Sequence, residues 1–262
     1  MAVDNDKYSI KAVMRCFQIL DFAADHNGPI SIPDVCTALD TNSNMAFRLL
    51  NSLESSGYMV KDATTGLYSV SLKTLKLSRR ALQSLVIRKV TMPYLELLWN
   101  QYPKANANMA VFHQDEVLML DRVDTQTTPR TYFTPGRVLP FHCSGLGKVL
   151  TCSLPEKEID KLIKEKGLKK YTENTITDPD RLKEELRKVK EEGVGRDRNE
   201  FMQGDNCSAV PIFGHEGAIV AAISLSSLST NMSADEIEAA IPVLKDTATK
   251  ISYVMGFGAQ LL

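Results

Sequence analysis

Histidine and cysteine residues in the C-terminal part of the chain could together form a catalytic pair. His142 stands directly before Cys143, and Cys207 lies further along the sequence. A histidine that takes the proton of a thiol creates the nucleophile of many hydrolases and transferases. Neighbouring residues of a strand point to opposite faces, so His142 and Cys143 can meet only if the chain turns between them. A cysteine-dependent enzyme that uses Cys207 or Cys143 with His142 is therefore one hypothesis.

The same side chains, with Asp197, also include competent metal ligands. His142, Cys143, Asp197 and Cys207 have the right chemical types for zinc, but their spacing follows no zinc-ligand pattern. The five cysteines form no CxxC pair and are odd in number, which argues against a disulfide framework. A metal sensor is thus a second hypothesis. We expect reduced thiols, a structural histidine, no cofactor and no catalytic activity.

Residues 44–55 suggest a different chemistry, the reading of DNA bases. At helical spacing, Leu49, Leu50 and Leu53 form an apolar stripe. The opposite face carries Arg48, which can bind guanine through two hydrogen bonds, and asparagines that can bind adenine in the same way. The residues that we expect to contact DNA are Thr41, Ser43, Asn44, Met45, Phe47, Arg48, Asn51, Lys61 and Thr65.

The elements around this helix predict a winged helix-turn-helix. Apolar residues at spacings of three and four indicate a helix over residues 10–24. Ser31 with Asp34 forms a capping-box pattern that begins a second helix, and residues 40–43 form a polar turn before the third. Gly57 ends the third helix, and residues 58–70 with Gly66 at the tip form a hairpin. Such a unit places its third helix in the major groove.

The charge distribution is uneven along this part of the chain. Residues 28–70 contain only two cations, Arg48 and Lys61, which is few for phosphate neutralisation. Residues 71–92 contain six cations and no acidic residue, on a helical apolar pattern. We expect a linker helix over residues 73–92. It either packs against a partner chain with its cations near DNA, or is a solvated helix that joins two domains.

Composition places the chain among ordinary globular proteins. Its 262 residues are enough for two domains, with 44% hydrophobic residues, 24% charged residues and a net charge of −1. The N-terminus has no basic patch followed by an apolar run, and no apolar stretch approaches the ~20 residues that cross a bilayer. We therefore expect a cytoplasmic protein without membrane contact.

Residues 93–262 predict an antiparallel α+β sensor domain. The expected strands are residues 107–113, 117–123, 131–133, 138–141, 207–213 and 218–226. The expected helices are residues 94–102, 145–152, one that opens at Pro155, 179–192 and 233–257.

Taken together, the sequence resembles the IclR family of bacterial transcription regulators over nearly its whole length. The N-terminal resemblance rests on AVMRCFQIL, on residues 44–50 ahead of residues 53–58, and on Gly66-Leu67-Tyr68. The C-terminal resemblance rests on residues 142–148, 197–200, 204–207 and the strand 218–226. It implies a winged helix-turn-helix domain over 1–72, a linker helix over 73–92 and a GAF-like effector-binding domain over 93–262. It also implies dimers or tetramers that bind palindromic operators in double-stranded DNA.

The resemblance also implies where a small-molecule effector, a small carboxylate or aromatic acid, would bind. By position, the family's pocket residues become Ser144, Gly145, Leu146, Asp197, Cys207, Ser224 and Ser226. Unpaired backbone N–H groups at a helix start favour an anion, and the two serines share one face of their strand. Asp197 suits this pocket only if it accepts hydrogen bonds from hydroxyl or amine groups of the ligand. Apolar residues such as Met109 and Phe141 are candidates for the remaining wall, and ordinary core packing is the alternative role for such residues.

Four residues depart from the family pattern, and they bear on which ligand the pocket takes. These are Cys143, Ser144, Asn199 and Asp205. The sequence leaves open the identity of the effector, the operator sequence, and the choice between repression and activation.

Overall fold

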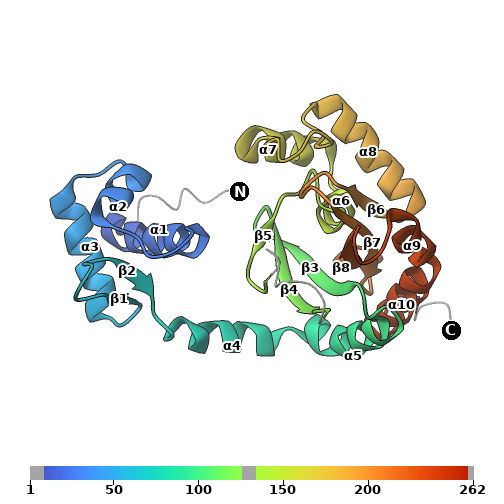
Figure 1. The fold of residues 1–262 in the computed structure, drawn as a ribbon, viewed down its shortest axis with the longest axis horizontal. Helices are drawn as coiled ribbons and strands as arrows, with labels where there is room; N and C mark the ends of the chain where they lie inside the picture. The colour runs from blue at the N-terminus through green and yellow to red at the C-terminus, as the bar shows by residue number, and fades with distance from the viewer. Residues whose placement is uncertain (1–8, 126–133, 259–262) are drawn as a thin grey trace. The chain divides into compact units, whose positions relative to one another are not determined.

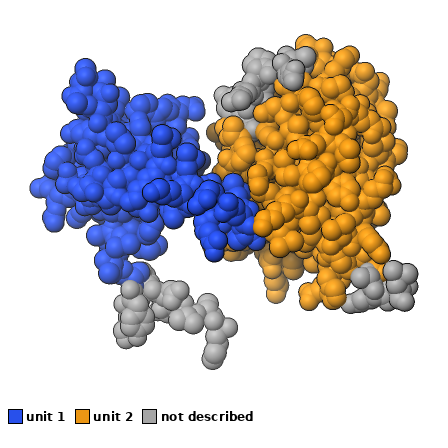
Figure 2. Space-filling view, turned by 90° about the horizontal axis from the view of Figure 1, so that it is seen from below, with its two compact units in different colours: residues 1–84 blue, residues 85–262 orange. Residues whose placement is uncertain are grey.

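The computed structural model describes residues 9–125 and 134–258. The chain divides into two compact units, residues 1–84 and residues 85–262, which Figure 2 colours separately. Each unit has its own apolar core. The division at residues 72 and 92 that the sequence suggests stays a prediction.

The first unit is a winged helix-turn-helix, as predicted. It comprises α1 (Lys11–Asp25), α2 (Ile32–Leu39), α3 (Ser43–Ser55), β1 (Met59–Lys61) and β2 (Tyr68–Val70), as Figure 1 shows. Ser31 and Asp34 form the predicted capping box, because the Ser31 backbone N–H donates to Asp34 Oδ2 at 2.8 Å and the Asp34 N–H donates to Ser31 Oγ at 3.3 Å. These reciprocal bonds fix the start of α2.

The core of this unit holds α3 in place. Leu50 of α3, Ile19 of α1 and Val35 of α2 are fully buried, and Tyr68 of the hairpin packs with them. Asn42 caps α3 by accepting a hydrogen bond from the Met45 N–H at 2.9 Å. The buried stripe of α3 is the predicted one, so its polar face points outward.

The expected single linker helix is two helices. α4 (Thr74–Ser84) ends before Leu85, whose ψ of 102° is extended, and α5 (Val86–Gln101) begins after it. α5 also continues through Pro93, where the sequence suggested a boundary. Proline removes one backbone hydrogen bond, and the burial of Ile87, Thr91, Leu95 and Leu98 along α5 offsets that loss. Neither the residue types around Leu85 nor their packing gives a physical reason for the break there.

The second unit is built on one six-stranded sheet. Its strands are β3 (Asn106–His113), β4 (Glu116–Val123), β5 (Val138–Leu139), β6 (Gly195–Arg198), β7 (Asp205–Phe213) and β8 (Ile219–Leu228). Their order is β5-β4-β3-β8-β7-β6, and every neighbouring pair is antiparallel, which confirms the predicted sheet class. The expected strand at residues 131–133 lies outside the described residues, and β5 is shorter than predicted. β6 was not predicted because its sequence, GRDR, carries no alternating apolar pattern.

Helices cover both faces of this sheet (Figure 1). α6 (Gly145–Thr151) packs on the sheet with α8 (Pro179–Glu192) beside it, and α7 (Glu156–Lys166) adds to the same core. α5 and α10 (Ile241–Val254) pack against each other and against the sheet, next to α9 (Ala234–Ala239). The expected single helix over 233–257 is wrong, because the helix breaks at Ala240 and restarts with Pro242 in its first turn.

Over the described residues, 9–125 and 134–258, we find no helix with the length and apolar character needed to span a membrane.

Candidate functional site

A small cavity lies where the start of α6 meets the sheet. Its volume is about 10 Å³, close to the minimum that holds one water molecule. Every strand of the sheet contributes to its wall. The lining residues are Asn108, Met119, Leu139, Ser144, Gly145, Leu146, Asp197, Asp205, Cys207, Ser224 and Ser226.

Strand register brings the polar side chains of this wall together. Ser226 of β8 stands opposite Cys207 of β7, and Cys207 stands opposite Asp197 of β6. Ser224 stands opposite Asn108 of β3. Residues directly opposite each other in an antiparallel pair share one face of the sheet. The sheet therefore points a hydroxyl, a thiol and a carboxyl in one row toward α6.

Two glycines allow α6 to come this close. A Cβ on Gly195 of β6 would collide with the Gly145 carbonyl oxygen and would lie 2.8 Å from the Val149 side chain. A Cβ on Gly145 would lie 3.0 Å from the Gly195 carbonyl oxygen and 3.2 Å from Cys207 Sγ. The backbone of α6 at Gly145 therefore packs directly on the backbone of β6 at Gly195, and this contact places residues 144–146 at the cavity.

All seven residues that the family resemblance assigned to a pocket line this cavity, and the two apolar candidates, Met109 and Phe141, do not. Met109 does not, because it lies between Asn108 and Ala110 on β3 and so points to the other face of the sheet. Phe141 lines a neighbouring, larger cavity that also holds His142 and Tyr171. The sequence missed Asn108, although a polar residue in a fully buried strand is a signal in itself.

The cavity contains two buried carboxyl groups. Burial raises the pKa of Asp197 to about 7 and the pKa of Asp205 to about 8. Hydrogen bonds from the Glu200 N–H at 2.7 Å and the Phe201 N–H at 3.3 Å hold Asp197 and partly oppose its shift. None of the residues that line the cavity is basic. An anion therefore meets carboxyl groups rather than a cation.

One lysine behind the cavity is fully buried. Lys148 of α6 donates to Glu200 Oε1 at 2.6 Å, to the Arg196 carbonyl oxygen at 2.8 Å and to Glu185 Oε1 at 3.1 Å. These bonds join α6 to α8 and to the segment around β6. Sequence reasoning used Lys148 only as part of a motif, since a lysine on a helix is usually solvated.

The arrangement does not activate a cysteine nucleophile. His142 is bonded through Nε2 to the Lys169 carbonyl oxygen at 3.0 Å, and burial lowers its pKa. Burial also raises the pKa of Cys143 and the pKa of Cys207, so both are thiols rather than thiolates at neutral pH. Within residues 9–125 and 134–258, no three His, Cys, Asp or Glu side chains are grouped to hold a metal ion.

In the first unit, α3 presents the predicted polar face to solvent. Ser43, Asn44, Phe47, Arg48 and Asn51 are exposed, and 46% of Phe47 is accessible.

Three other predicted contacts have protein partners. Met45 packs partly against the core, Thr41 Oγ1 accepts from Arg15 at 3.1 Å, and Thr65 Oγ1 donates to Asp62 at 2.9 Å. Thr65 and Lys61 lie in the hairpin, where both are exposed.

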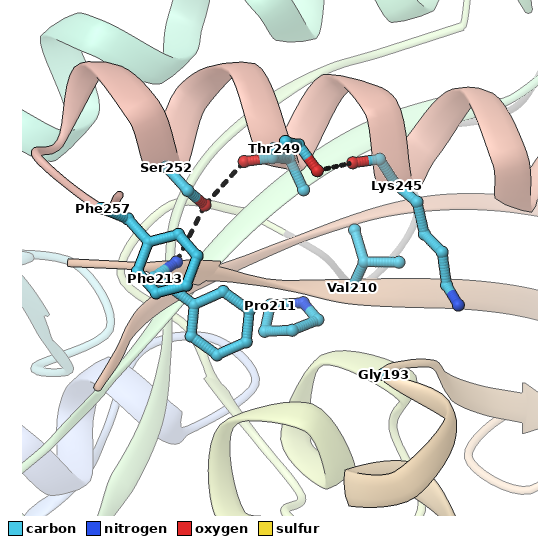
Figure 3. A pocket seen from close by; sticks show the side chains of 9 residues that line it. Gly193, Val210, Pro211, Phe213, Lys245, Thr249, Ser252 and Phe257 are labelled. Atoms are coloured by element: carbon cyan, nitrogen blue, oxygen red, sulfur yellow. Dashed lines mark hydrogen bonds between the residues drawn. The ribbon is translucent and has the colours of Figure 1, made fainter. Parts of the chain in front are cut away.

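A third hollow lies between α10 and β7 and differs in character (Figure 3). Its volume is about 220 Å³, and Pro211, Phe213 and Phe257 give it an apolar wall. The hydroxyl of Ser252 is occupied, since it donates to Ala248 and accepts from the Phe213 N–H at 3.0 Å. This hollow therefore offers a mainly apolar wall with few polar groups to position a specific ligand.

Comparison with known families gives two matches that together cover most of the chain. Residues 12–63 match the model of the IclR helix-turn-helix domain. Residues 79–253 match the model of the bacterial transcriptional regulator IclR C-terminal domain.

Individual proteins agree with these matches. The transcriptional regulator KdgR of Escherichia coli is 28% identical over 97% of this chain and 96% of its own. The crystal structure of the Thermotoga maritima IclR, 26% identical, covers 95% of this chain and 100% of its own with a TM-score of 0.69. An IclR homologue from Microbacterium hydrocarbonoxydans, complexed with 4-hydroxybenzoate, is 21% identical, covers 92% and 98%, and has a TM-score of 0.74.

The buried carboxyl groups predict how stability depends on pH. A folded-state pKa of about 8 for Asp205, against about 3.9 for an unfolded aspartate, means that stability falls as the pH rises between these values. We expect Asp205→Asn to be more stable than the wild type at pH 8, with the difference vanishing near pH 4. Thermal unfolding at both pH values measures this, and exposed Asp235→Asn serves as control. A wild type more stable than Asp205→Asn at pH 8 contradicts it.

The buried lysine predicts a large effect of a single substitution. Lys148→Met leaves Glu200 buried without its cation, and losing one partner of a buried pair lowers the free energy of unfolding by roughly 3–5 kcal/mol. Adding Glu200→Gln should recover part of this loss. Lys188→Met, which breaks an exposed pair with Glu184, should leave the free energy of unfolding nearly unchanged. Denaturant unfolding compares the variants, and equal losses for Lys148→Met and Lys188→Met would refute the role of Lys148.

Proposed function

The chain belongs to the IclR family of bacterial transcriptional regulators, and we propose that a small organic acid, bound in the cavity under α6, controls how the chain binds DNA. The observation that carries this proposal is the convergence of side chains from all six strands, with the start of α6, on one small polar cavity. Specific ligand sites combine such convergent polar groups with an otherwise apolar wall.

The size of the cavity indicates how a ligand acts. A volume of about 10 Å³ admits one water molecule and no organic acid, so the ligand binds an arrangement in which α6 stands further from the sheet. A ligand that binds one arrangement better than another shifts the population toward it. Because Lys148 joins α6 to α8 and β6, a displacement of α6 changes the packing of these elements as well.

DNA reading is assigned to the exposed face of α3. Arg48 is the candidate for guanine, Asn44 and Asn51 for adenine, and Phe47 for apolar contact with the groove. Ser43 and Thr41 lie at the start of the helix, where hydroxyl groups reach phosphate, and the hairpin with Lys61 and Thr65 contacts the flanking backbone.

α4 supports the proposal of a homodimer or homotetramer. None of its residues is buried, even though several are leucines. Leu75 and Leu77 are 61% and 60% exposed, and Leu72, just before the helix, is 82% exposed. Burial of these leucines against a second copy of the chain removes them from water. Paired reading helices match a palindromic operator with a fixed half-site spacing. The protein would act in the cytoplasm, where bacterial DNA is found.

The ligand class follows from the cavity and from a relative. The Microbacterium hydrocarbonoxydans homologue was crystallised with 4-hydroxybenzoate, an acid that also carries a hydroxyl group. Hydroxyl and carboxyl groups both suit a wall of serine, asparagine and carboxyl side chains. Repression and activation are both compatible with this arrangement.

Operator binding tests the function directly. We expect the purified chain to bind the promoter region beside its own gene in a fluorescence anisotropy titration, and a suitable acid to change the affinity. Arg48→Ala should weaken specific binding by about 1–3 kcal/mol, because it removes a hydrogen-bonded pair with a base. Ser55→Ala, at the far end of the same helix, is the control. Absence of specific binding at low salt, with and without candidate acids, would exclude the proposal.

The cations of α4 should supply affinity rather than specificity. Replacing Lys76, Arg79 and Arg80 with glutamine should weaken binding to all sequences. The slope of log affinity against log salt concentration should become shallower by about 0.9 for each phosphate that is no longer neutralised. Replacing three exposed lysines of α7, Lys157, Lys161 and Lys164, is the matched control. Equal salt slopes for the two triple variants would mean that the α4 cations are a solvated surface.

A further inference from the structure

Two buried oxygen atoms, on residues that line the cavity under α6, accept no hydrogen bond from any described residue. They are Asn108 Oδ1 and Asp205 Oδ2. Asn108 is 2% exposed and Asp205 is 4% exposed, so bulk water does not reach them freely. Buried acceptors without a donor are rare and unfavourable. Both residues line the same cavity.

The orientation of Asn108 is fixed by its neighbours. Its Nδ2 atom donates toward the Asn106 carbonyl oxygen at 3.3 Å and lies 3.1 Å from both Ser224 Oγ and Ser226 Oγ. A backbone carbonyl only accepts, so turning the amide over would set oxygen against oxygen. The NH₂ group is therefore held on the serine side, and Oδ1 is the atom left to a ligand.

Asp205 adds a second buried oxygen without a partner, and both oxygens of its carboxyl group are acceptors when the group is ionised. Asp197 lines the same cavity, and its charge opposes ionisation of Asp205, while Arg122 attracts the ionised form. Cys207 contributes a thiol, which is a weak donor. A plain carboxylate carries no donor for Asn108 Oδ1 or for ionised Asp205. A hydroxyl or ammonium group brings donors to them.

We infer that the ligand of this cavity is an acid that also carries a hydroxyl or amino group, and that Asn108 and Asp205 select it over the plain acid of the same carbon skeleton. This inference rests on the proposed function, because it specifies the ligand of the same site. A site built to hydrogen-bond a donor discriminates strongly against the analogue that lacks it, since its buried polar groups are then left unpaired.

Matched sets of acids test the inference on the full-length chain. One set is propanoate, lactate and alanine, a second is succinate, malate and aspartate, and a third is benzoate and 4-hydroxybenzoate. Isothermal titration calorimetry gives the affinities. We expect at least one donor-bearing acid to bind, with an affinity at least about tenfold higher than that of its plain analogue, which corresponds to one hydrogen bond of ordinary strength.

Two substitutions at Asp205 separate the two kinds of donor. Asp205→Leu removes the acceptor and should reduce the preference to less than about threefold. Asp205→Asn keeps an acceptor but cannot ionise, so a preference for a hydroxy acid persists, whereas a preference for an amino acid, whose ammonium group favours ionised Asp205, is lost. Met109→Leu, on the other face of β3, should leave every affinity unchanged. Thermal unfolding of each variant establishes that it is folded.

The outcomes distinguish this inference from the proposed function. A plain acid that binds as tightly as its hydroxy and amino analogues overturns the inference and leaves the proposed function standing. An unchanged preference in folded Asp205→Leu also overturns it. Absence of binding by every acid, with no effect on operator affinity, overturns both.

Discussion

The effector-binding unit depends on the direct packing of α6 against β6. Gly145 and Gly195 permit this contact, since a side chain at Gly195 would collide with the carbonyl oxygen of Gly145. Lys148 then holds α6 from behind through bonds to Glu200, Glu185 and the carbonyl oxygen of Arg196. Close-packed elements of this kind move together, so a displacement of α6 is transmitted to its neighbours. Any ligand that widens the cavity therefore acts on the whole set of elements joined by Lys148.

The cavity is one of the places where the fold departs from the rules that stabilise it. Two carboxyl groups with pKa values raised to about 7 and about 8 lie close together, and two buried oxygens lack donors among the described residues. The rest of this face is an ordinary apolar core around residues such as Leu146, Val149 and Leu182. Local departures of this kind are expected at functional sites, where a binding partner supplies what the fold leaves unsatisfied.

The sequence predicted the elements with strong periodic or capping signals, and missed those defined only by tertiary contacts. The helices of the first unit and the capping box at Ser31 follow from local pattern, and the structure confirms them. β6 has no apolar alternation and exists because β7 pairs with it. Lys148 looks solvated in a one-dimensional pattern, and its burial follows from carboxylates 37 and 52 positions away. Asp205 stood out in the sequence as unusual, but only the structure places it beside Asn108 in one cavity.

The energies involved are sufficient for regulation. Allosteric coupling between a ligand and a second site is typically 1–3 kcal/mol, or about 5–150-fold in affinity. A hydrogen bond contributes about 0.5–1.5 kcal/mol net, so a ligand that donates to both Asn108 Oδ1 and Asp205 Oδ2 has roughly 1–3 kcal/mol available from these two atoms. Widening the cavity uses part of this energy. The remaining energy is comparable to a typical coupling energy. It produces coupling only if the ligand binds the widened arrangement more tightly than the compact one, because a ligand with equal affinity for both does not change their populations. Since the compact cavity of about 10 Å³ excludes an organic acid, that difference is built into its size.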